Sequence, residues 1–265
     1  MPLSDRLAFT LGDDGVGHLR LTRGDKLNAL DPAMIDALLS AGGALHDMPG
    51  LRCLVLSGEG RGFCAGLDLA SMAAGLADAG DLAARTHGNA NRFQQMAMQL
   101  RKLPVPVIAS IHGVCLGGGL QIAAGADIRV AAPDARLAVM ETRWGIVPDM
   151  GHFALWRGVV RGDLLRELTY THREFSGEEA RSMGFVTHCD ADPLLRAIDL
   201  ACEIALRSPA AIRAAKALFA RADDSATDEI LMAEAIEQQR LIGSRNQMEA
   251  VASQMAGRPA KFIEP

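Results

Sequence analysis

The stretch Leu103–Gln121 (LPVPVIASIHGVCLGGGLQ) constrains the fold more than any other part of the chain. Its apolar run Val105–Ile111 predicts a buried strand, and three successive glycines, 117–119, then open the helix-forming run Leu120–Ala124. Glycine lowers helix stability, so three of them at a helix start need a separate reason. Either the corner is tightly packed, or a ligand atom approaches the unpaired N–H groups at the positive end of the helix dipole. Both interpretations, a packed corner and an anion or oxyanion site, stay open on this stretch alone.

The composition argues against several classes of protein. A chain of 265 residues can hold one large domain with ample core. Its apolar runs fall short of the ~18 residues of a membrane span. The early run Leu3–Leu11 carries Asp5 and Arg6 and so lacks the apolar core of a signal peptide, and we do not expect export. The five scattered cysteines are typical of reduced thiols and argue against zinc. With a net charge of −5 and no basic block, we expect a cytoplasmic protein without membrane, metal or nucleic-acid partners.

Strand and helix signals alternate through the first 192 residues. Strands are expected at 7–11, 16–21, 51–57, 105–111, 128–131, 136–139 and 185–188. Helices are expected at 32–46, 81–102, 120–124, 153–170 and 177–183, the first of them with Asp31 as N-cap and Pro32 at the first helical position. The stretch 72–80 is rich in small residues, and we expect it to be mobile. The alternation predicts an α/β fold with parallel strand pairing.

The chain from Pro193 onward shows no strand signal. Helices are expected at 194–206, 210–222 and 227–256. We therefore predict two regions, an α/β core over 1–192 and a helical region over 193–265 that serves assembly or covers a site.

Several local patterns suggest chemistry that their surroundings do not support. The run Gly60–Ala65 fits G-x-G-x-x-A, but no second strand ending in an acid follows, so we do not interpret it as a dinucleotide site. Cys64 and Cys115 lie in glycine-rich turns and could be nucleophiles, although such cysteines are more often apolar fillers. The seven histidines show no metal-binding spacing, and we expect no metal site.

Two loops that follow strands, 63–69 (FCAGLDL) and 115–121 (CLGGGLQ), offer backbone N–H groups among small neighbours. Glu141 comes twenty residues after the second loop. Together with their neighbours, these motifs resemble the crotonase superfamily, the enoyl-CoA hydratase/isomerase family. The resemblance spans nearly the whole chain through five motifs in order: DKLNAL at 25–30, FCAGLDL at 63–69, PVIASIHGVCLGGG at 106–119, ADIRVA at 126–131 and GRPAKF at 257–262.

The resemblance implies a crotonase (ClpP-like) spiral of ββα turns in two sheets, followed by helices that assemble a homotrimer or a dimer of trimers. It implies an acyl-CoA thioester as substrate, with no separate cofactor because coenzyme A is part of that substrate. Two backbone N–H groups would hold the enolate-like thioester oxygen, and by motif position they belong to Leu67 and Gly118. Such donors are each worth roughly 10²–10³ in rate.

The same resemblance assigns residues to binding. The stretches that would line coenzyme A or substrate contain Lys26, Leu27, Ala29, Ala65, Leu67, Asp68, Leu69, Ala70 and Gly117. Arg23, Lys26 or Arg61 could meet the CoA phosphates, although each could equally be an ordinary solvated cation. Lys261 and Phe262 could reach a CoA site, and Trp144 and Phe153 could wall the acyl pocket.

The sequence departs from the hydratase pattern at one position. Hydratases of the family use two glutamates to hold and activate a water; Glu141 matches the second, but Gln121 stands where the first should be. A glutamine can hydrogen-bond a water or a substrate but cannot carry a proton. Because a positioned acid or base is worth roughly 10²–10⁴ in rate, we expect hydration to be impaired.

Asp149 favours isomerisation instead. It occupies a turn where hydratases usually have glycine, and where dienoyl-CoA isomerases and a thioester-linked dehalogenase have an aspartate. Glu141 and Asp149 could move a proton along an enoyl- or dienoyl-CoA, unless Asp149 merely caps a helix or Glu141 pairs with Arg143 or Arg129. The alternatives are a hydratase in which Gln121 holds the water, an Asp149-dependent hydrolase or dehalogenase, and a non-catalytic binding protein.

Overall fold

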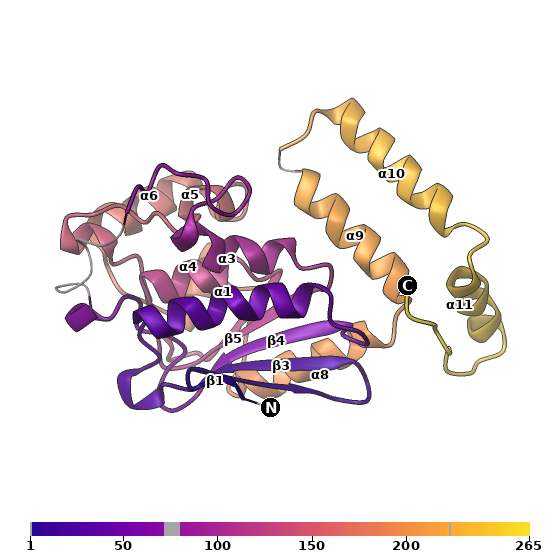
Figure 1. Cartoon of the computed structure of the whole chain (residues 1–265), viewed down its shortest axis with the longest axis horizontal. Coiled ribbons are helices and arrows are strands. Elements are labelled where there is room, and N and C mark those ends of the chain that lie inside the picture. Colours follow the sequence, from indigo (N-terminus) through magenta and orange to yellow (C-terminus); the bar gives the residue numbers. More distant parts are fainter. Residues whose placement is uncertain (1, 72–79, 223) are drawn as a thin grey trace.

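The computed structural model describes residues 2–71, 80–222 and 224–265 (Figure 1). The stretch 72–80, for which we expect mobility, lies outside the described residues except for Gly80. A seven-stranded sheet forms the centre, in the order β1-β2-β3-β4-β5-β7-β10. Its strands are β1 (Pro2–Ser4), β2 (Leu7–Leu11), β3 (Val16–Leu21), β4 (Cys53–Gly58), β5 (Val107–Ile111), β7 (Ile128–Ala131) and β10 (His188–Cys189).

The pairing in this sheet changes from antiparallel to parallel. The first three strands form antiparallel pairs, and from β3 onward every pair is parallel, with Val16 opposite Cys53 and Leu56 opposite Ala109. A smaller sheet has the order β6-β8-β9, made of β6 (Val114–Leu116), β8 (Arg136–Ala138) and β9 (Phe175–Ser176). The α/β fold with a helical C-terminal region is therefore confirmed.

Helices cover both faces of the large sheet (Figure 1). The helices α1 (Pro32–His46), α3 (Arg92–Lys102) and α4 (Gly118–Ala124) lie over one face, and α8 (Pro193–Ala205) packs against β3, β4, β5 and β7 on the other. Strand β4 shows the alternation: Leu54 and Leu56 belong to the main core, whereas Cys53 and Val55 pack towards α8. Parallel strands covered on both faces need such continuous apolar runs.

The start of α1 is confirmed by its cap. The Asp31 side chain accepts a hydrogen bond from the Met34 N–H at 2.8 Å, and Pro32 occupies the first turn. Arg6 forms an ion pair with the same carboxylate at 2.8 Å.

Three predicted helices are wrong in extent. The helix expected from residue 81 begins at Arg92, because the side chain and backbone of Asn91 form a capping box with Gln94. The helix expected at 153–170 is split into α5 (His152–Leu155) and α6 (Gly162–Thr171), with Gly158 at φ 74 between them. The helix expected at 227–256 is split into α10 (Thr227–Leu241) and α11 (Arg245–Met255). Gly243 at φ 75 ends the first, because a left-handed residue cannot continue a right-handed helix.

Two strand predictions also change. The segment 112–116, for which no strand is predicted, contains β6, and the strand expected at 185–188 is β10, which begins only at His188. Both strands are too short for the alternation of side chains to reveal them. The remaining elements are η1 (Gly24–Lys26), η3 (Glu141–Trp144), α7 (Gly177–Met183) and α9 (Pro209–Ala222).

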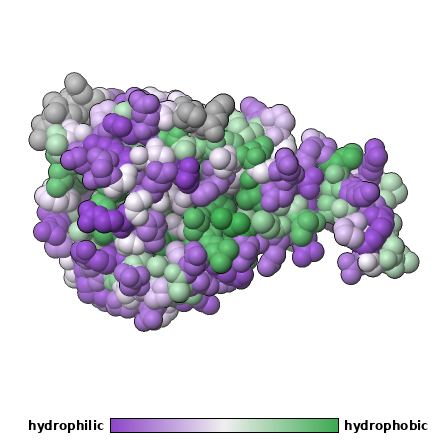
Figure 2. Space-filling view, turned by 90° about the horizontal axis from the view of Figure 1, so that it is seen from below, coloured by the Kyte–Doolittle hydropathy of each residue, from purple (hydrophilic) through white to green (hydrophobic). Residues whose placement is uncertain are grey.

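The last three helices, α9 to α11, form an arm that extends away from the sheet (Figure 1). Figure 2 shows hydrophobic residues at the surface along this arm, and Phe219, Met232 and Met255 are among its exposed apolar side chains. The division at residue 193 and the assembly role of the helical region stay predictions; α8 lies against the sheet, whereas the arm does not. In the described part of the chain, no helix is long and apolar enough to cross a membrane.

Candidate active site

The two loops that carry the glycine-rich motifs meet side by side in the structure. The Cys64 N–H donates to the Val114 carbonyl and the Leu116 N–H donates to the Cys64 carbonyl, each at 3.0 Å. Beside this junction lies a cavity of about 200 Å³. It is lined by Ala65, Gly66, Leu67, Leu69, Leu116, Gly117, Gly118, Met140, Glu141, Trp144 and Ile146.

The glycine triplet serves both purposes that the sequence left open. A Cβ at Gly119 would lie 2.3 Å from the Cys64 carbonyl oxygen, so this position requires close packing of two backbones. Gly117 has φ 50, and a Cβ there would lie 3.3 Å from Glu141 Oε1. Gly117 and Gly118, the middle glycine of the triplet, line the cavity. The corner is therefore tightly packed on one side and open to a ligand on the other.

Leu67 and Gly118, the two expected oxyanion donors, lie at this cavity. The backbone on either side of Leu67 is engaged, because the Leu30 N–H donates to Gly66 and the Asp68 N–H donates to Leu30. Gly118 is the first residue of α4, where an N–H has no partner within the helix. Within 2–71, 80–222 and 224–265, neither the Leu67 N–H nor the Gly118 N–H donates a hydrogen bond to the protein.

Glu141 lines the cavity, and one of its carboxyl oxygens has no hydrogen-bond partner among the described residues. The residue begins η3, separated by two residues from the end of β8, and is 6% exposed. Its Oε1 accepts a hydrogen bond from Gln121 Nε2 at 2.5 Å, whereas its buried Oε2 has no hydrogen-bond partner among the described residues. Burial raises the pKa of Glu141, nearby backbone N–H groups and the Gln121 hydrogen bond oppose this, and the nearby Asp149 charge raises the pKa further.

An ion pair between Glu141 and a neighbouring arginine is not seen in the described part of the chain. The Arg129 guanidinium donates to the carbonyls of Phe185 and Ala126. Arg143 lies over the ring of Trp144. The carboxyl is therefore not neutralised by either cation.

Gln121 occupies a different place from the one expected. It is 2% exposed and does not line the cavity; its Oε1 accepts a hydrogen bond from the Met150 N–H at 2.7 Å, and its Nε2 donates to Glu141. The side chain is thus engaged behind Glu141, rather than hydrogen-bonding a substrate or water in the pocket.

Asp149 lies near Glu141 without capping a helix. The helix α5 has Gly151 as its N-cap with no side-chain cap, so the capping interpretation of Asp149 is wrong. The residue is half-buried, and burial raises the pKa of its carboxyl. It does not line the 200 Å³ cavity, but its charge acts on Glu141.

Of the three cations considered for the CoA phosphates, Arg23 is already engaged. Its guanidinium donates to Asp68 Oδ2 at 2.6 Å and lies 3.4 Å from Asp31 Oδ2. Asp68 in turn accepts hydrogen bonds from the N–H groups of Ala70 and Ser71, so its carboxylate organises the loop. Lys26 and Arg61 are exposed, and no ion pair involving either is formed among the described residues.

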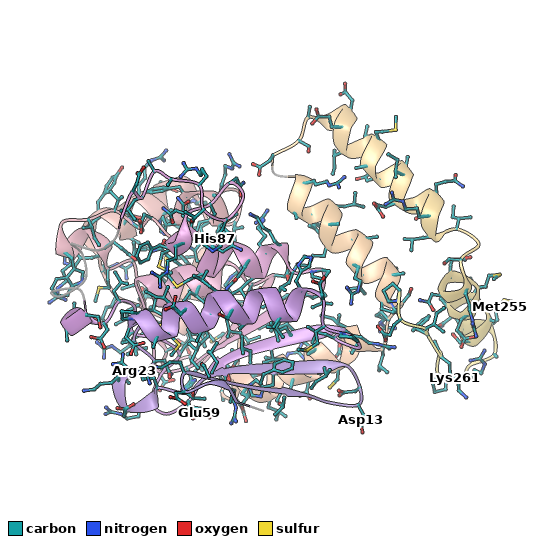
Figure 3. All side chains as sticks on the ribbon, viewed as in Figure 1. Asp13, Arg23, Glu59, His87, Met255 and Lys261 are labelled. Atoms are coloured by element: carbon teal, nitrogen blue, oxygen red, sulfur yellow. The ribbon has the colours of Figure 1, made fainter. Side chains whose placement is uncertain are left out.

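The remaining expected pocket residues are divided. Trp144 lines the cavity, whereas Phe153 does not and is 61% exposed. Lys261 lies on the arm side of the molecule, far from Arg23 on the opposite side (Figure 3), and its backbone N–H donates to Glu249. Within one chain the structure therefore does not bring Lys261 and its neighbour Phe262 to the cavity.

The sequence analysis missed Met140 and Ile146, which line the cavity beside Glu141. Their closeness to Glu141 in the sequence was the available signal. It also missed the Met150 N–H, because a backbone group gives no signal in the sequence. Burial raises the pKa of Cys64 to about 12 and that of Cys115 well above its ordinary value, which disfavours the thiolate that a nucleophile needs. No cluster of three metal-ligating side chains occurs in the part of the chain that the structure describes.

Comparisons with known proteins agree with this geometry. The family model for enoyl-CoA hydratase/isomerase matches residues 12–263. The mitochondrial Delta(3,5)-Delta(2,4)-dienoyl-CoA isomerase of Rattus norvegicus is 31% identical, over 98% of this chain and 82% of its own. The mitochondrial methylglutaconyl-CoA hydratase of Mus musculus is 32% identical, over 76% of this chain and 65% of its own. The crystal structure of an enoyl-CoA hydratase from Bacillus anthracis superposes with a TM-score of 0.89 at 26% identity, covering 97% of this chain and 98% of that one.

The fold and the family match together define an enzyme class that acts on acyl-CoA thioesters. The chain belongs to the enoyl-CoA hydratase/isomerase family of the crotonase superfamily.

Proposed function

We propose that this protein moves a double bond within an enoyl- or dienoyl-CoA by proton transfer. One observation carries the proposal: Glu141 lines the same cavity as Leu67 and Gly118, and among the described residues neither their N–H groups nor Glu141 Oε2 has a hydrogen-bond partner, whereas Oε1 is bound by an amide. A single carboxyl beside an oxyanion hole is sufficient to remove a proton and return it.

The proposed reaction starts with the thioester carbonyl oxygen against the N–H groups of Leu67 and Gly118. Glu141 Oε2 takes a proton from the carbon α or γ to the carbonyl, and the C–H electron pair moves into the conjugated system. The negative charge collects on the thioester oxygen, where the two donors stabilise it. Protonation at another carbon of the chain then restores a neutral isomer. No water is consumed, because substrate and product have the same atoms.

Asp149 is proposed as a second proton donor for carbons beyond the reach of Glu141. Burial raises the pKa of its carboxyl, which favours the protonated form that a donor needs. Transfer along a dienoyl chain would use both carboxyls, whereas a shift by one position would use Glu141 alone. The name of the rat relative supports the dienoyl substrate.

Hydration is the second candidate, supported by the name of the mouse relative. It requires a water held and activated by two groups. Gln121 already accepts from Met150 and donates to Glu141. The geometry therefore favours isomerisation over hydration.

Binding and assembly follow the family pattern in this proposal. The backbone and side chains at 26–30 and 65–70 would line coenzyme A, with Lys26 and Arg61 rather than Arg23 near its phosphates. The apolar surface of the arm would pack against other copies in a trimer or a dimer of trimers, and the cytoplasm is the proposed location.

The test offers purified protein 2-enoyl-, 3-enoyl- and 3,5-dienoyl-CoA thioesters in D₂O, with products identified by mass spectrometry. We expect isomers that carry deuterium and have no added water, and a loss of dienoyl turnover of about tenfold or more in Asp149→Asn. Rapid hydration without isomerisation would overturn the proposal. Binding of CoA compounds without any turnover would favour the dehalogenase-like or non-catalytic alternatives.

A further inference from the structure

The Gln121 side chain has a defined orientation inside the protein. The Met150 N–H can only donate, so the amide atom that faces it at 2.7 Å must be the oxygen. The amide nitrogen therefore faces Glu141 Oε1 at 2.5 Å and donates to it. Since Gln121 is 2% exposed, solvent does not compete for either hydrogen bond.

This orientation distinguishes the two oxygens of Glu141. Oε1 has to accept a hydrogen bond from the amide, so it is unsuited to carry the transferred proton. Oε2 is the buried oxygen without a partner in the described part of the chain. A base whose reacting atom is fixed in this way is already oriented before the substrate arrives.

The same amide also holds the far end of the loop that carries both carboxyls. Glu141 opens this loop and Met150 lies next to Asp149. Gln121 belongs to α4, so both carboxyls are held relative to this one helix. Glu141 is held through its own side chain, and Asp149 is held through the backbone N–H of its neighbour Met150. We infer that Gln121 is a positioning residue that aims Glu141 Oε2 into the cavity and sets the distance from Glu141 to Asp149. This inference rests on the proposed function.

The neutrality of Gln121 is part of the inference. A glutamate at this position would still accept from Met150 but would place a second carboxyl oxygen against Glu141 Oε1. Two carboxyls in such contact share one proton and titrate as a pair. Asp149 is the charged side chain that acts on Glu141 in the described structure. His152 on α5, which packs against α4, is buried, has its pKa lowered to about 4 and contacts Thr169 instead.

The experiment compares the wild type with Gln121→Met, Gln121→Glu and a matched control, Gln99→Met. Gln99 is also a buried helical glutamine, and it donates to the Leu38 carbonyl away from the cavity. The kcat and KM for the thioester that the wild type turns over are measured against pH. Circular dichroism melting shows that each variant is folded.

For Gln121→Met we expect kcat to fall roughly 10–100-fold with KM changed less than about threefold, because the base is misaimed while substrate contacts remain. The part of the pH profile in which kcat rises with pH should shift to higher pH by roughly one unit, because the ionised form of Glu141 loses a hydrogen bond. Gln121→Glu should show a maximum and a decline at higher pH, where both carboxyls ionise. Gln99→Met should have a lower melting temperature than the wild type but the same dependence of kcat on pH.

A profile for Gln121→Met that coincides with those of the wild type and Gln99→Met would overturn the inference. A second readout separates this failure from failure of the proposed function. A ¹³C-glutamate NMR titration, with the Glu141 signal assigned through Glu141→Gln, reports the carboxyl directly and needs no turnover. A Glu141 titration midpoint at higher pH in Gln121→Met supports the positioning role even if none of the thioesters reacts. An unchanged midpoint contradicts it.

Discussion

Two buried polar junctions in this molecule join segments that are distant in the sequence, one at the cavity and one at the base of the arm. At the base of the arm, Lys216 Nζ donates to the carbonyls of Leu100 and Val105 and to Asp127 Oδ2, at 3.0, 2.7 and 2.8 Å. All three donors of that ammonium group have acceptors. At the cavity, Gln121 satisfies one oxygen of Glu141 and leaves the other without a partner among the described residues.

The difference separates a junction that holds structure from one that is available for chemistry. A buried polar atom without a partner costs about 1–3 kcal/mol. The Lys216 junction avoids that cost completely and fixes α9 to the strand and helix ends beneath it. The Glu141 junction retains the cost at the one oxygen that our proposal assigns to proton transfer. Substitutions at the two junctions should therefore affect different measurable properties.

The largest effect is expected for Glu141→Gln. The amide keeps the shape of the side chain and can still accept from Gln121, but it cannot take a proton, so kcat should fall by roughly 10²–10⁴. Steady-state kinetics with the reactive thioester measure this. Unchanged turnover would contradict the proposed mechanism and with it the distinction between the two junctions.

Lys216→Met tests the completed junction. Removing the ammonium leaves two carbonyls and the Asp127 carboxylate without their donor, and we expect the free energy of unfolding to fall by about 3 kcal/mol. Urea denaturation followed by circular dichroism measures the change. The kcat per folded molecule should stay within about twofold of the wild type. A large loss of kcat in a stably folded variant would show that the arm junction also serves the site.

The smallest effect concerns stability in Glu141→Gln. Burial raises the pKa of Glu141 in the folded state above its ordinary value of 4.5, so ionising this group costs folding free energy at neutral pH. The variant lacks that cost and should be more stable than the wild type near pH 7. The gain should disappear as the pH falls below about 4.5, where the carboxyl is protonated in both states. Denaturation at several pH values checks the sign, and a gain that grows towards acid pH would contradict it.

Local signals were sufficient for much of the fold. Asp31 followed by Pro32 defined the start of α1, because capping depends only on adjacent residues. The breaks near Gly158 and Gly243 were missed, because a single glycine between helix formers signals a break only when its φ is known. The short strands β6 and β10 likewise depend on partners elsewhere in the chain.

The sequence predicted part of the membership of the site, but not its connections. The motifs brought Leu67, Gly118 and Glu141 to one cavity, as expected from the resemblance. The hydrogen bonds of Gln121 could not be anticipated, because its partners lie 20 and 29 positions away and one of them is a backbone N–H. The engagement of Arg23 with Asp68, 45 positions apart, was hidden for the same reason.

The backbone pairing between Cys64 and Cys115 has a consequence for engineering. It fixes the two loops through main-chain atoms, and the proposed oxyanion donors are also main-chain atoms. The side chains of Leu67, Leu69 and Ile146 can therefore be redesigned to admit bulkier or more polar acyl groups while the donors keep their spacing. The range of acyl groups can therefore be changed through side chains without altering the main-chain N–H donors proposed to stabilise the thioester oxygen.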